Sequence, residues 1–417
     1  MRLIARTLCP GLLLALLLAA GSATAQDRAP ALTAPAGAPA AAPADAPAAA
    51  PAAQGQQKPP DGFTVGGFTF KPGGRVKLDI IRDFKPIDNE DSFDTRTIPI
   101  GAGDRTNSNL IAKETRLSID IRGPVEGHEV RMYVEGDFYG SGSAFRLRHA
   151  YGTWRGLLAG QYWSTFVDED NLPRTIDFES PTAFAQIRQA QLRYTHKFSD
   201  HVTWAVAVED NKSNIILPDN IPGRAEFPSP DFATRVRFDF PNGHINASAF
   251  TGAARFRADG LPDTDNLDDP DPDTVTLWGT ALSANFSTVG RDTAYGVVTY
   301  GDGIGRYRGG ITAVPDETGT LQAAGGIAFM GGYEHFWADK WSSNGVFSVG
   351  KSDDQPFYTA DVNRRLTYGA VNLLYWFLGD RGWMGVEYLY GKREVFAADP
   401  NSATAHRVQY AVRFNLP

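Results

Sequence analysis

Hydrophobic and polar residues alternate with a period of two along much of the chain. In the stretch 113–138, KETRLSIDIRGPVEGHEVRMYVEGDF, the apolar residues Leu117, Ile119 and Ile121 alternate with polar or charged ones, and the pattern resumes at Val130 after a short turn. This period predicts β-strands with one apolar and one polar face. The alternation alone leaves two folds open: a soluble sandwich with a buried apolar face, or a membrane barrel whose apolar side chains meet lipid.

Sixteen segments of this kind follow one another from about Phe68 to Pro417, and helical periodicity is absent among them. Most are about ten residues long, the length that a tilted strand needs to cross a bilayer. The expected strands span residues 75–84, 114–123, 129–138, 145–154, 156–163, 187–198, 201–210, 233–240, 243–252, 274–287, 290–300, 324–337, 341–351, 366–377, 382–392 and 405–414.

The connections between these strands alternate between short and long, with one compact exception at 139–144. The short connections are residues 123–128, 155–156, 199–200, 241–243, 287–290, 338–340 and 378–382. The long ones, rich in Asp, Pro, Gly and Asn, are residues 85–113, 164–186, 211–232, 253–273, 301–323, 352–365 and 393–404. A sandwich gives no reason to collect long loops at one end, whereas an outer-membrane barrel has short periplasmic turns and long extracellular loops.

Aromatic residues cluster beside the expected turns, as a girdle at a membrane interface would require. The preference of aromatics for strands explains their presence but not their position at strand ends. The clustered residues are Trp154, Phe198, Trp204, Phe240, Trp337, Trp341, Trp376, Phe377 and Trp383. We therefore predict an all-β fold, a transmembrane antiparallel up-and-down β-barrel of about 16 strands that occupies residues 62–417.

The N-terminal segment has a different character. Residues 1–25 combine a positively charged start, a short apolar stretch and the small-residue site Ala23-Thr24-Ala25, which is typical of a secretory signal peptide and too short for a membrane span. Residues 26–61 are mostly Ala and Pro, and the frequent prolines forbid a helix. We expect a disordered, extended periplasmic linker that is a passive tether or a spacer in contact with the cell wall.

Composition and motifs exclude several functions. The single cysteine, Cys9, lies in the expected signal peptide, so the mature chain has no disulfide and no thiolate metal site. Loss of the two signal-peptide arginines would change the formal net charge from −8 to −10, which argues against nucleic acid as a partner. The acidic stretch 263–274 offers oxygen ligands for a hard cation, but a solvated loop is the simpler interpretation. With no nucleophile elbow or metal-binding histidine pair, we expect no enzyme activity, no cofactor and no metal.

If the polar face of each strand points inward, basic residues dominate the first half of the lumen. Arg outnumbers Lys by 30 to 10, and a guanidinium keeps its charge and binds carboxylates bidentately. A wall of arginines in a water-filled tube attracts small anions. The alternative is that these arginines pair with acids on the same faces, such as Asp120 and Asp137, and only keep the lumen wet. The predicted basic set is Arg75, Lys77, Arg116, Arg122, Arg131, Arg146, Arg148, Arg193, Arg235 and Arg237.

The connection 164–186 follows the fifth expected strand, where general porins of sixteen strands carry a loop that folds back and narrows the barrel. Its charged residues are Asp168, Glu169, Asp170, Arg174, Asp177 and Glu179. We expect this acidic loop to face the basic wall across a constriction and to create a transverse field; a solvated external loop is the alternative. His149 and His196 fall on the expected lipid-facing register, which argues against a histidine-based hydrolase.

Several segments are similar to the DcaP-like trimeric outer-membrane porins, which are sixteen-stranded. The resemblance covers residues 66–417 and is carried by GGRVKLDIIRDF, AKETRLSIDIRGP, VEGDFYGSGSAFRLRHAYG, LLAGQYWSTFVDEDNLPRTIDFESP and the closing RVQYAVRF. It implies a homotrimer and passive uptake of small anionic compounds, notably dicarboxylates. Two features depart from the family: the Ala/Pro tether stands where members can carry a coiled coil, and the chain ends in Asn415-Leu416-Pro417 instead of an aromatic residue.

We therefore expect a porin of the bacterial outer membrane that passes small hydrophilic solutes by diffusion and prefers anions such as dicarboxylates. Its partners would be those solutes, the surrounding lipid and lipopolysaccharide, and two further copies of the chain. The alternatives are a general non-specific porin and a barrel-based outer-membrane hydrolase. A secreted sandwich or solenoid adhesin would require an internal repeat, which the sequence lacks.

Overall fold

The structure, a computed structural model, describes residues 62–416. Within this range, the positions that are not described are 212, 218–221, 259–273, 317–319, 357, 359–361, 380 and 397–398. The expected signal peptide, the Ala/Pro-rich linker and the acidic stretch except Thr274 lie outside the described residues.

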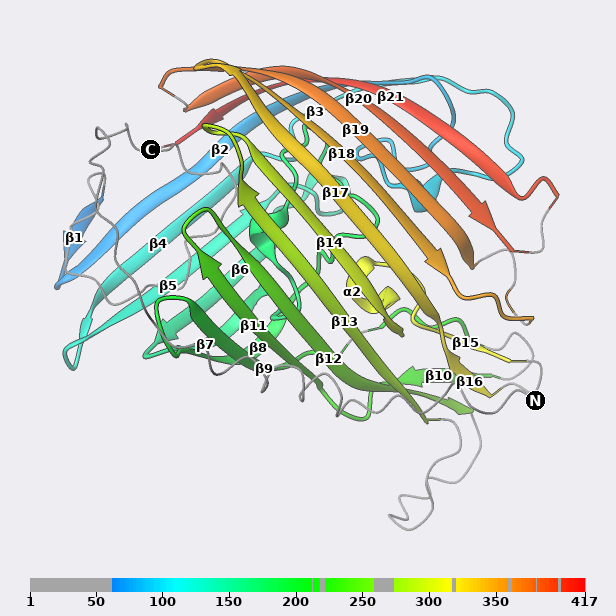
Figure 1. Cartoon of the computed structure of the whole chain (residues 1–417), viewed down its shortest axis with the longest axis horizontal. Helices are drawn as coiled ribbons and strands as arrows, with labels where there is room; N and C mark the ends of the chain where they lie inside the picture. The colour runs from blue at the N-terminus through cyan, green and yellow to red at the C-terminus, as the bar shows by residue number, and fades with distance from the viewer. Residues whose placement is uncertain are drawn as a thin grey trace, which may run out of the picture. The chain divides into compact units, whose positions relative to one another are not determined.

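Sixteen long antiparallel strands form one closed barrel (Figure 1). They are β2 (Phe68–Asp83), β4 (Arg116–Val125), β5 (His128–Asp137), β6 (Arg146–Trp154), β7 (Leu157–Trp163), β8 (Arg188–Lys197), β9 (Val202–Glu209), β11 (Asp231–Phe240), β12 (Gly243–Ala258), β13 (Thr274–Ser287), β14 (Thr293–Asp302), β17 (Gly325–Ala338), β18 (Trp341–Ser352), β19 (Asn363–Phe377), β20 (Gly382–Val395) and β21 (Ser402–Asn415). All sixteen predicted strands are confirmed. The largest differences are in β2, which begins seven residues earlier than expected, and in β12, which ends six residues later, where the short strand β10 (Gly223–Glu226) pairs with it.

The first strand of the barrel, β2, closes it by pairing with the last strand. One edge of β2 pairs with β21 over residues 75–83, and its other edge pairs with β4 over residues 69–75. Further along the same edge of β2, residues 79–83 pair with the short strand β3 (Asn107–Ile111) instead of β4. A segment expected to be loop therefore supplies ladder hydrogen bonds, and closure lets backbone groups pair within the membrane.

The remaining elements are short and belong to the connections. They are β1 (Phe63–Val65), the pair β15 (Ala313–Pro315) and β16 (Leu321–Ala323), the 3₁₀ turns η1 (Thr95–Thr97), η2 (Ser141–Ser143) and η3 (Glu169–Asn171), and the single helical turn α2 (Gly305–Arg308). Among the described residues, none of the helices is long and apolar enough to cross a membrane.

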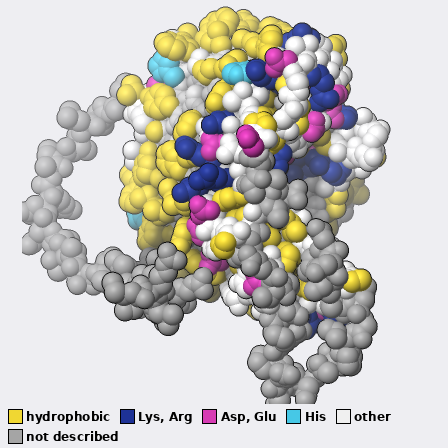
Figure 2. Space-filling view, turned by 90° about the vertical axis from the view of Figure 1, so that its right-hand side faces the viewer, with side chains coloured by type: hydrophobic (Ala, Val, Ile, Leu, Met, Phe, Trp, Pro, Cys, Tyr) yellow, Lys and Arg dark blue, Asp and Glu magenta, His cyan; other side chains and the backbone are white. Residues whose placement is uncertain are grey.

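Side chains alternate between the two faces of the barrel as predicted. On β2, Val76 and Leu78 are exposed on the outer face, whereas Lys77 and Asp79 are buried on the inner one. Seen from the side that carries β10, β15 and β16, Lys and Arg side chains gather in the middle of the face, and hydrophobic side chains cover its upper and left-hand margins (Figure 2). Charged groups therefore line the inside of the barrel and apolar groups its outside.

The aromatic girdle is confirmed for most of the predicted residues but not for two tryptophans. Trp154, Phe198 and Trp337 are exposed beside the turns, whereas Trp376 and Trp383 are only 5% and 4% exposed. On β19 the neighbours of Trp376 point outward, so the alternation turns its indole inward. Placing both indoles in the membrane interface was wrong; they contact lumen cations instead.

Candidate functional site

Residues 164–187, which connect β7 to β8, fold into the barrel; we call this segment the constriction loop. Its contacts lie on strands across the barrel from its own ends. The Asn171 side-chain amide donates to the carbonyl of Gly296 on β14, at 3.2 Å, and the backbone N–H of Ala183 donates to Ser348 Oγ on β18, at 2.9 Å. The loop therefore crosses the lumen.

The first part of the loop is fastened to β9 and β12. Glu209 accepts hydrogen bonds from Ser164 Oγ, at 2.6 Å, and from the N–H of Thr165, at 2.7 Å. Ser248 Oγ donates to the carbonyl of Phe166, at 2.9 Å, and the Phe166 ring is buried inside the barrel. These partners fix the direction in which the loop enters.

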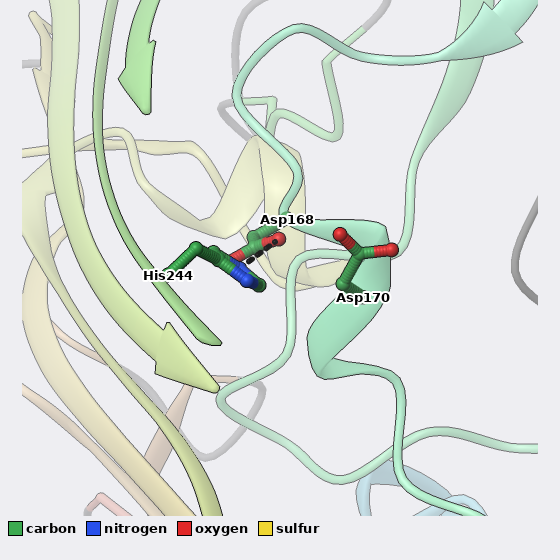
Figure 3. Close-up of side chains that lie close together, drawn as sticks. All are labelled: Asp168, Asp170 and His244. Atoms are coloured by element: carbon green, nitrogen blue, oxygen red, sulfur yellow. Dashed lines mark hydrogen bonds and ion pairs between the residues drawn. The ribbon is translucent and has the colours of Figure 1, made fainter. Parts of the chain in front are cut away.

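Asp168 is the next anchor of the loop, and its partners lie on β12 and β13. Its carboxylate lies 3.0 Å from His244 Nε2 and accepts from Ser283 Oγ at 2.5 Å. Burial opposes ionisation of Asp168, but the hydrogen bond from His244 lowers the pKa of this carboxyl below its usual range. Asp168, Asp170 and His244 offer ligand atoms that lie within 4.8 Å of one another (Figure 3), but the Asp170 carboxylate pairs with Arg237. These bonds use the oxygens that a metal would need, so we assign the cluster to anchoring.

The far part of the loop is fastened to the last strands of the barrel. Glu387 on β20 accepts the N–H groups of Ile176 and Asp177, at 2.9 and 2.8 Å. The buried carboxylate of Asp177 accepts from the N–H of Phe93, at 2.9 Å, and from Nη1 of Arg407 on β21, at 3.1 Å. The pKa of Asp177 is raised because burial outweighs these favourable contacts.

Parts of two further loops meet the constriction loop at Arg96 in η1. The Arg96 guanidinium pairs with Asp94 and Glu179, at 2.7 and 3.1 Å, and donates to the carbonyls of Arg308 and Gly309, at 3.0 and 2.5 Å. One cation therefore holds together the connections between β2 and β3, β7 and β8, and β14 and β15.

The helical turn α2 brings the third of these loops inside. Arg306 is 4% exposed and donates to Asp231 on β11, at 2.8 Å, and to Gln189 on β8, at 2.6 Å. Gly309 ends the turn at φ 69°, and a Cβ there would lie 2.0 Å from Arg96 Nη1. The sequence predicted one inward loop; Arg96 and Arg306 were missed because nothing in the local pattern distinguishes them from arginines of solvated loops.

All ten predicted lumen cations lie on the inner faces of β2, β4, β5, β6, β8 and β11, and eight of them form ion pairs. The pairs join Arg75 and Lys77 to Glu114, Arg122 and Arg131 to Asp120, Arg116 and Arg148 to Glu135, Arg146 and Arg148 to Asp137, and Arg237 to Asp170 and Asp239. For these eight cations, the alternative interpretation applies: acids close to them on the inner side of the barrel neutralise their positive charges.

Three inner-face arginines have no ion pair to a carboxylate within the described part of the chain. Arg193 lies 5.2 Å from the ring centre of Tyr162, and Arg235 donates only to the carbonyl of Val167. Arg188, 4.3 Å from the ring centre of Trp163, also faces the basic wall of Arg116, Arg146 and Arg148. Arg188 was missed because strict alternation from Arg193 places it on the lipid side.

The expected position of His149 was wrong. The ladder between β5 and β6 shifts by one residue opposite Glu135 and Gly136, so two consecutive residues of β6, Arg148 and His149, are buried inside. A bulge of this kind inverts the alternation beyond it. The His149 ring lies 5.1 Å from that of Tyr162. His196 is exposed on the outer face, as predicted.

The carboxylates of the constriction loop are engaged mainly with its anchors. The pairs are Asp168 with His244, Asp170 with Arg237, Asp177 with Arg407, and Glu179 with Arg96, and the one loop cation, Arg174, pairs with Glu334. Glu169 accepts from Tyr162 Oη, at 3.1 Å, and burial raises its pKa to about 7. The negative charge that the sequence places on this loop is therefore largely compensated where the loop meets its partners.

The sequence matches the family model described as DcaP outer membrane protein over residues 64–416. The chain belongs to this family. The crystal structure of the outer membrane channel DcaP of Acinetobacter baumannii is similar at 22% identity and a TM-score of 0.73, covering 85% of this chain and 100% of that one. An anion-selective porin from Comamonas acidovorans (12% identity, TM-score 0.55, 84% and 100% covered) and OmpT of Vibrio cholerae (12%, 0.54, 85% and 100%) share the fold. No curated protein sequence matches.

Family membership settles the general function. The protein is a channel of the bacterial outer membrane, and the family indicates a channel rather than an enzyme.

Proposed function

We propose that this DcaP-family channel passes small hydrophilic solutes by diffusion and prefers anionic ones, such as dicarboxylates. The observation that carries the proposal is that Arg188, Arg193 and Arg235 face the lumen without an ion pair to any described carboxylate. Positive charge without a fixed counter-ion inside a narrow aqueous tube lowers the energy of an entering anion and raises that of a cation.

The geometry of these arginines suits carboxylates. Stacking on aromatic rings holds the guanidinium planes of Arg188 and Arg193 in place, so less side-chain freedom is lost when an anion binds. Two such groups along one wall could engage the two ends of a dicarboxylate in succession. The porin from Comamonas acidovorans, which has the same fold, is anion-selective, and this supports the same direction of selectivity here.

A general porin without selectivity is the second candidate, and a specific observation favours it. Eight of the ten predicted lumen cations are paired with acids, so most of the wall offers little net field. The two candidates differ only in whether the three arginines without carboxylate partners dominate the potential along the path.

We also propose that the channel assembles as a homotrimer. OmpT of Vibrio cholerae, which shares the fold, has been solved in a trimer form. An apolar outer face that includes Val76, Leu78 and Leu117 is compatible with either lipid or a second protomer. Native mass spectrometry of the detergent-solubilised protein measures the assembly directly.

The test of anion preference replaces the unpaired charges and leaves the ion pairs alone. We predict that Arg188→Gln/Arg193→Gln lowers the anion-to-cation permeability ratio about threefold, because loss of roughly half a kT of potential acts in opposite directions on anions and cations. The ratio follows from reversal potentials in planar bilayers under a KCl gradient. Arg188→Lys/Arg193→Lys keeps both charges and should keep the ratio.

The matched control is Arg155→Gln/Arg381→Gln, which removes two arginines from periplasmic turns. It should leave the reversal potential unchanged. If the lumen double variant also leaves it unchanged while the protein still folds, by heat-modifiable migration on a gel, the anion preference is refuted and the general porin stands.

A further inference from the structure

An unusual group of cations lies on the outer, lipid-facing side of the barrel, near the extracellular ends of β18, β19 and β20. Lys351 and Arg365 are exposed and Lys392 is half-buried, and all three share a face with outward residues such as Phe347 and Val371. We call Lys351, Arg365 and Lys392 the outer basic cluster. The three strands run side by side in the barrel (Figure 1).

Two members of the cluster face each other directly. Lys351 is the cross-strand partner of Arg365, and like charges in that position repel. Neither side chain forms a hydrogen bond or an ion pair with another described residue. Asp353 acts on Lys351 electrostatically without forming an ion pair, and Glu394, opposite Arg365, pairs with Lys392 at 2.6 Å.

The same barrel shows how outward cations are neutralised when the chain supplies the partner itself. At the corresponding end of β12, Arg255 and Arg257 lie 2.6 and 2.9 Å from carboxylate oxygens of Glu226, which the short strand β10 brings beside them. No described carboxylate forms such a pair with Lys351 or Arg365. Among the described residues, Lys351 and Arg365 therefore have no ion-pair partner, so an anion from outside the chain can neutralise them.

The position of the cluster indicates which anion can neutralise it. Toward the membrane, the same faces of β18 to β20 carry Phe347, Val371, Val386 and Tyr388, all at least 44% exposed, which form part of the apolar band. The cations lie beyond this band on the loop side, which faces outward in an outer-membrane barrel. The headgroups at that depth are those of the outer leaflet, whose glycolipid carries phosphate groups.

We propose that Lys351 and Arg365, supported by Lys392, bind a phosphate group of lipopolysaccharide, at the lipid A headgroup. A phosphate between the two side chains converts their repulsion into two charge-assisted hydrogen bonds, and a guanidinium can bind it through two parallel bonds. The apolar residues below the cluster pack against the acyl chains of the same molecule. The site is a lipid site on the outer wall and is independent of what the lumen conducts.

The test compares bisphosphorylated lipid A with its monophosphoryl form. The full-length protein in detergent is titrated with each lipid and the bound fraction is measured by native mass spectrometry. We expect tighter binding of the bisphosphorylated form. Lys351→Gln/Arg365→Gln should weaken that binding about thirtyfold, because each basic residue at an anionic headgroup contributes about fivefold. These variants relieve repulsion and should fold, which heat-modifiable migration verifies.

Lys340→Gln/Arg381→Gln is the matched control, because it removes one lysine and one arginine from periplasmic turns. Its lipid binding should equal that of the unmodified protein. Three results would overturn the proposal: equal binding by the cluster variant, no preference between the two lipids, or displacement of lipid by millimolar inorganic phosphate, which would indicate a free-anion site. A changed oligomeric state without a change in lipid binding would also overturn it and would assign the cluster to a contact between protomers.

Discussion

The anchor of the constriction loop at Asp177 offers a sharp test of how the pore is narrowed. The Asp177 carboxylate and the Arg407 guanidinium are both fully buried, 3.1 Å apart, and the carboxylate also accepts the N–H of Phe93. We predict that Asp177→Asn loosens the loop, because the amide keeps the shape and one acceptor oxygen but loses the charge.

The structure sets the size of the effect. Removal of one partner of a buried ion pair costs about 3–5 kcal/mol when the other charge is left alone. Arg407 is not left alone, because Asp83 still accepts from it at 2.7 and 3.2 Å, so we expect the lower limit, about 3 kcal/mol. At 1.4 kcal/mol per tenfold, that raises the ratio of unseated to seated loop about 150-fold.

Single-channel recording in planar bilayers measures the outcome. An unseated loop should produce brief openings of higher conductance and more current noise, and backbone amides of 174–180 should exchange hydrogen faster. The matched control is Asp200→Asn, the same replacement at an exposed turn residue whose one ion pair among the described residues is with Lys197. Unchanged conductance, noise and exchange in a folded Asp177→Asn channel would refute the idea that this anchor holds the loop.

Two further predictions concern pH. Burial raises the pKa of Glu169 to about 7, so its carboxyl ionises as pH rises through 7 and adds a negative charge near Arg193 and Arg235. We therefore expect the anion selectivity measured in bilayers to fall from pH 6 to pH 8. Glu169→Gln should abolish this pH dependence. Burial opposes ionisation of Glu114, but Lys77 and Arg75 lower its pKa from 4.5 to about 2. The ionised carboxylate therefore stabilises the folded state by about 3 kcal/mol above pH 4.5, and this stabilisation is lost as pH falls toward 2. The melting temperature should therefore drop over that window, and less so in Glu114→Gln; an equal drop in both would contradict the assignment.

The barrel itself could be predicted from the sequence because each of its rules is local. Period-two alternation gives the strands, and the alternating lengths of connections give the two ends. The misplacement of His149 came from a local rule that was broken by one residue. The bulge in β6 moved His149 from the lipid side to the lumen, and a one-residue shift of this kind leaves no mark in the pattern of apolar positions.

The arrangement inside the lumen could be predicted only in part, because it depends on contacts between residues far apart in the chain. The basic faces and the charged loop were evident from composition. The sequence could not show that Arg96 joins three loops, or that Arg407 on the last strand fastens both Asp83 on the first strand and Asp177. Such partners are set by closure of the barrel, which brings the chain ends together.

These contacts change what composition implies about selectivity. A count of arginines predicts a strong field, but a paired arginine adds little potential along the path because its carboxylate lies within about 3 Å. The field therefore depends on the few cations without such a partner, and Arg188, the clearest of them, falls on the register that alternation assigns to lipid. It follows that replacing Arg146 and Arg148, which pair with Asp137, would expose a buried acid and disturb the wall, whereas replacing Arg188 and Arg193 removes the cations on which the proposed anion preference rests.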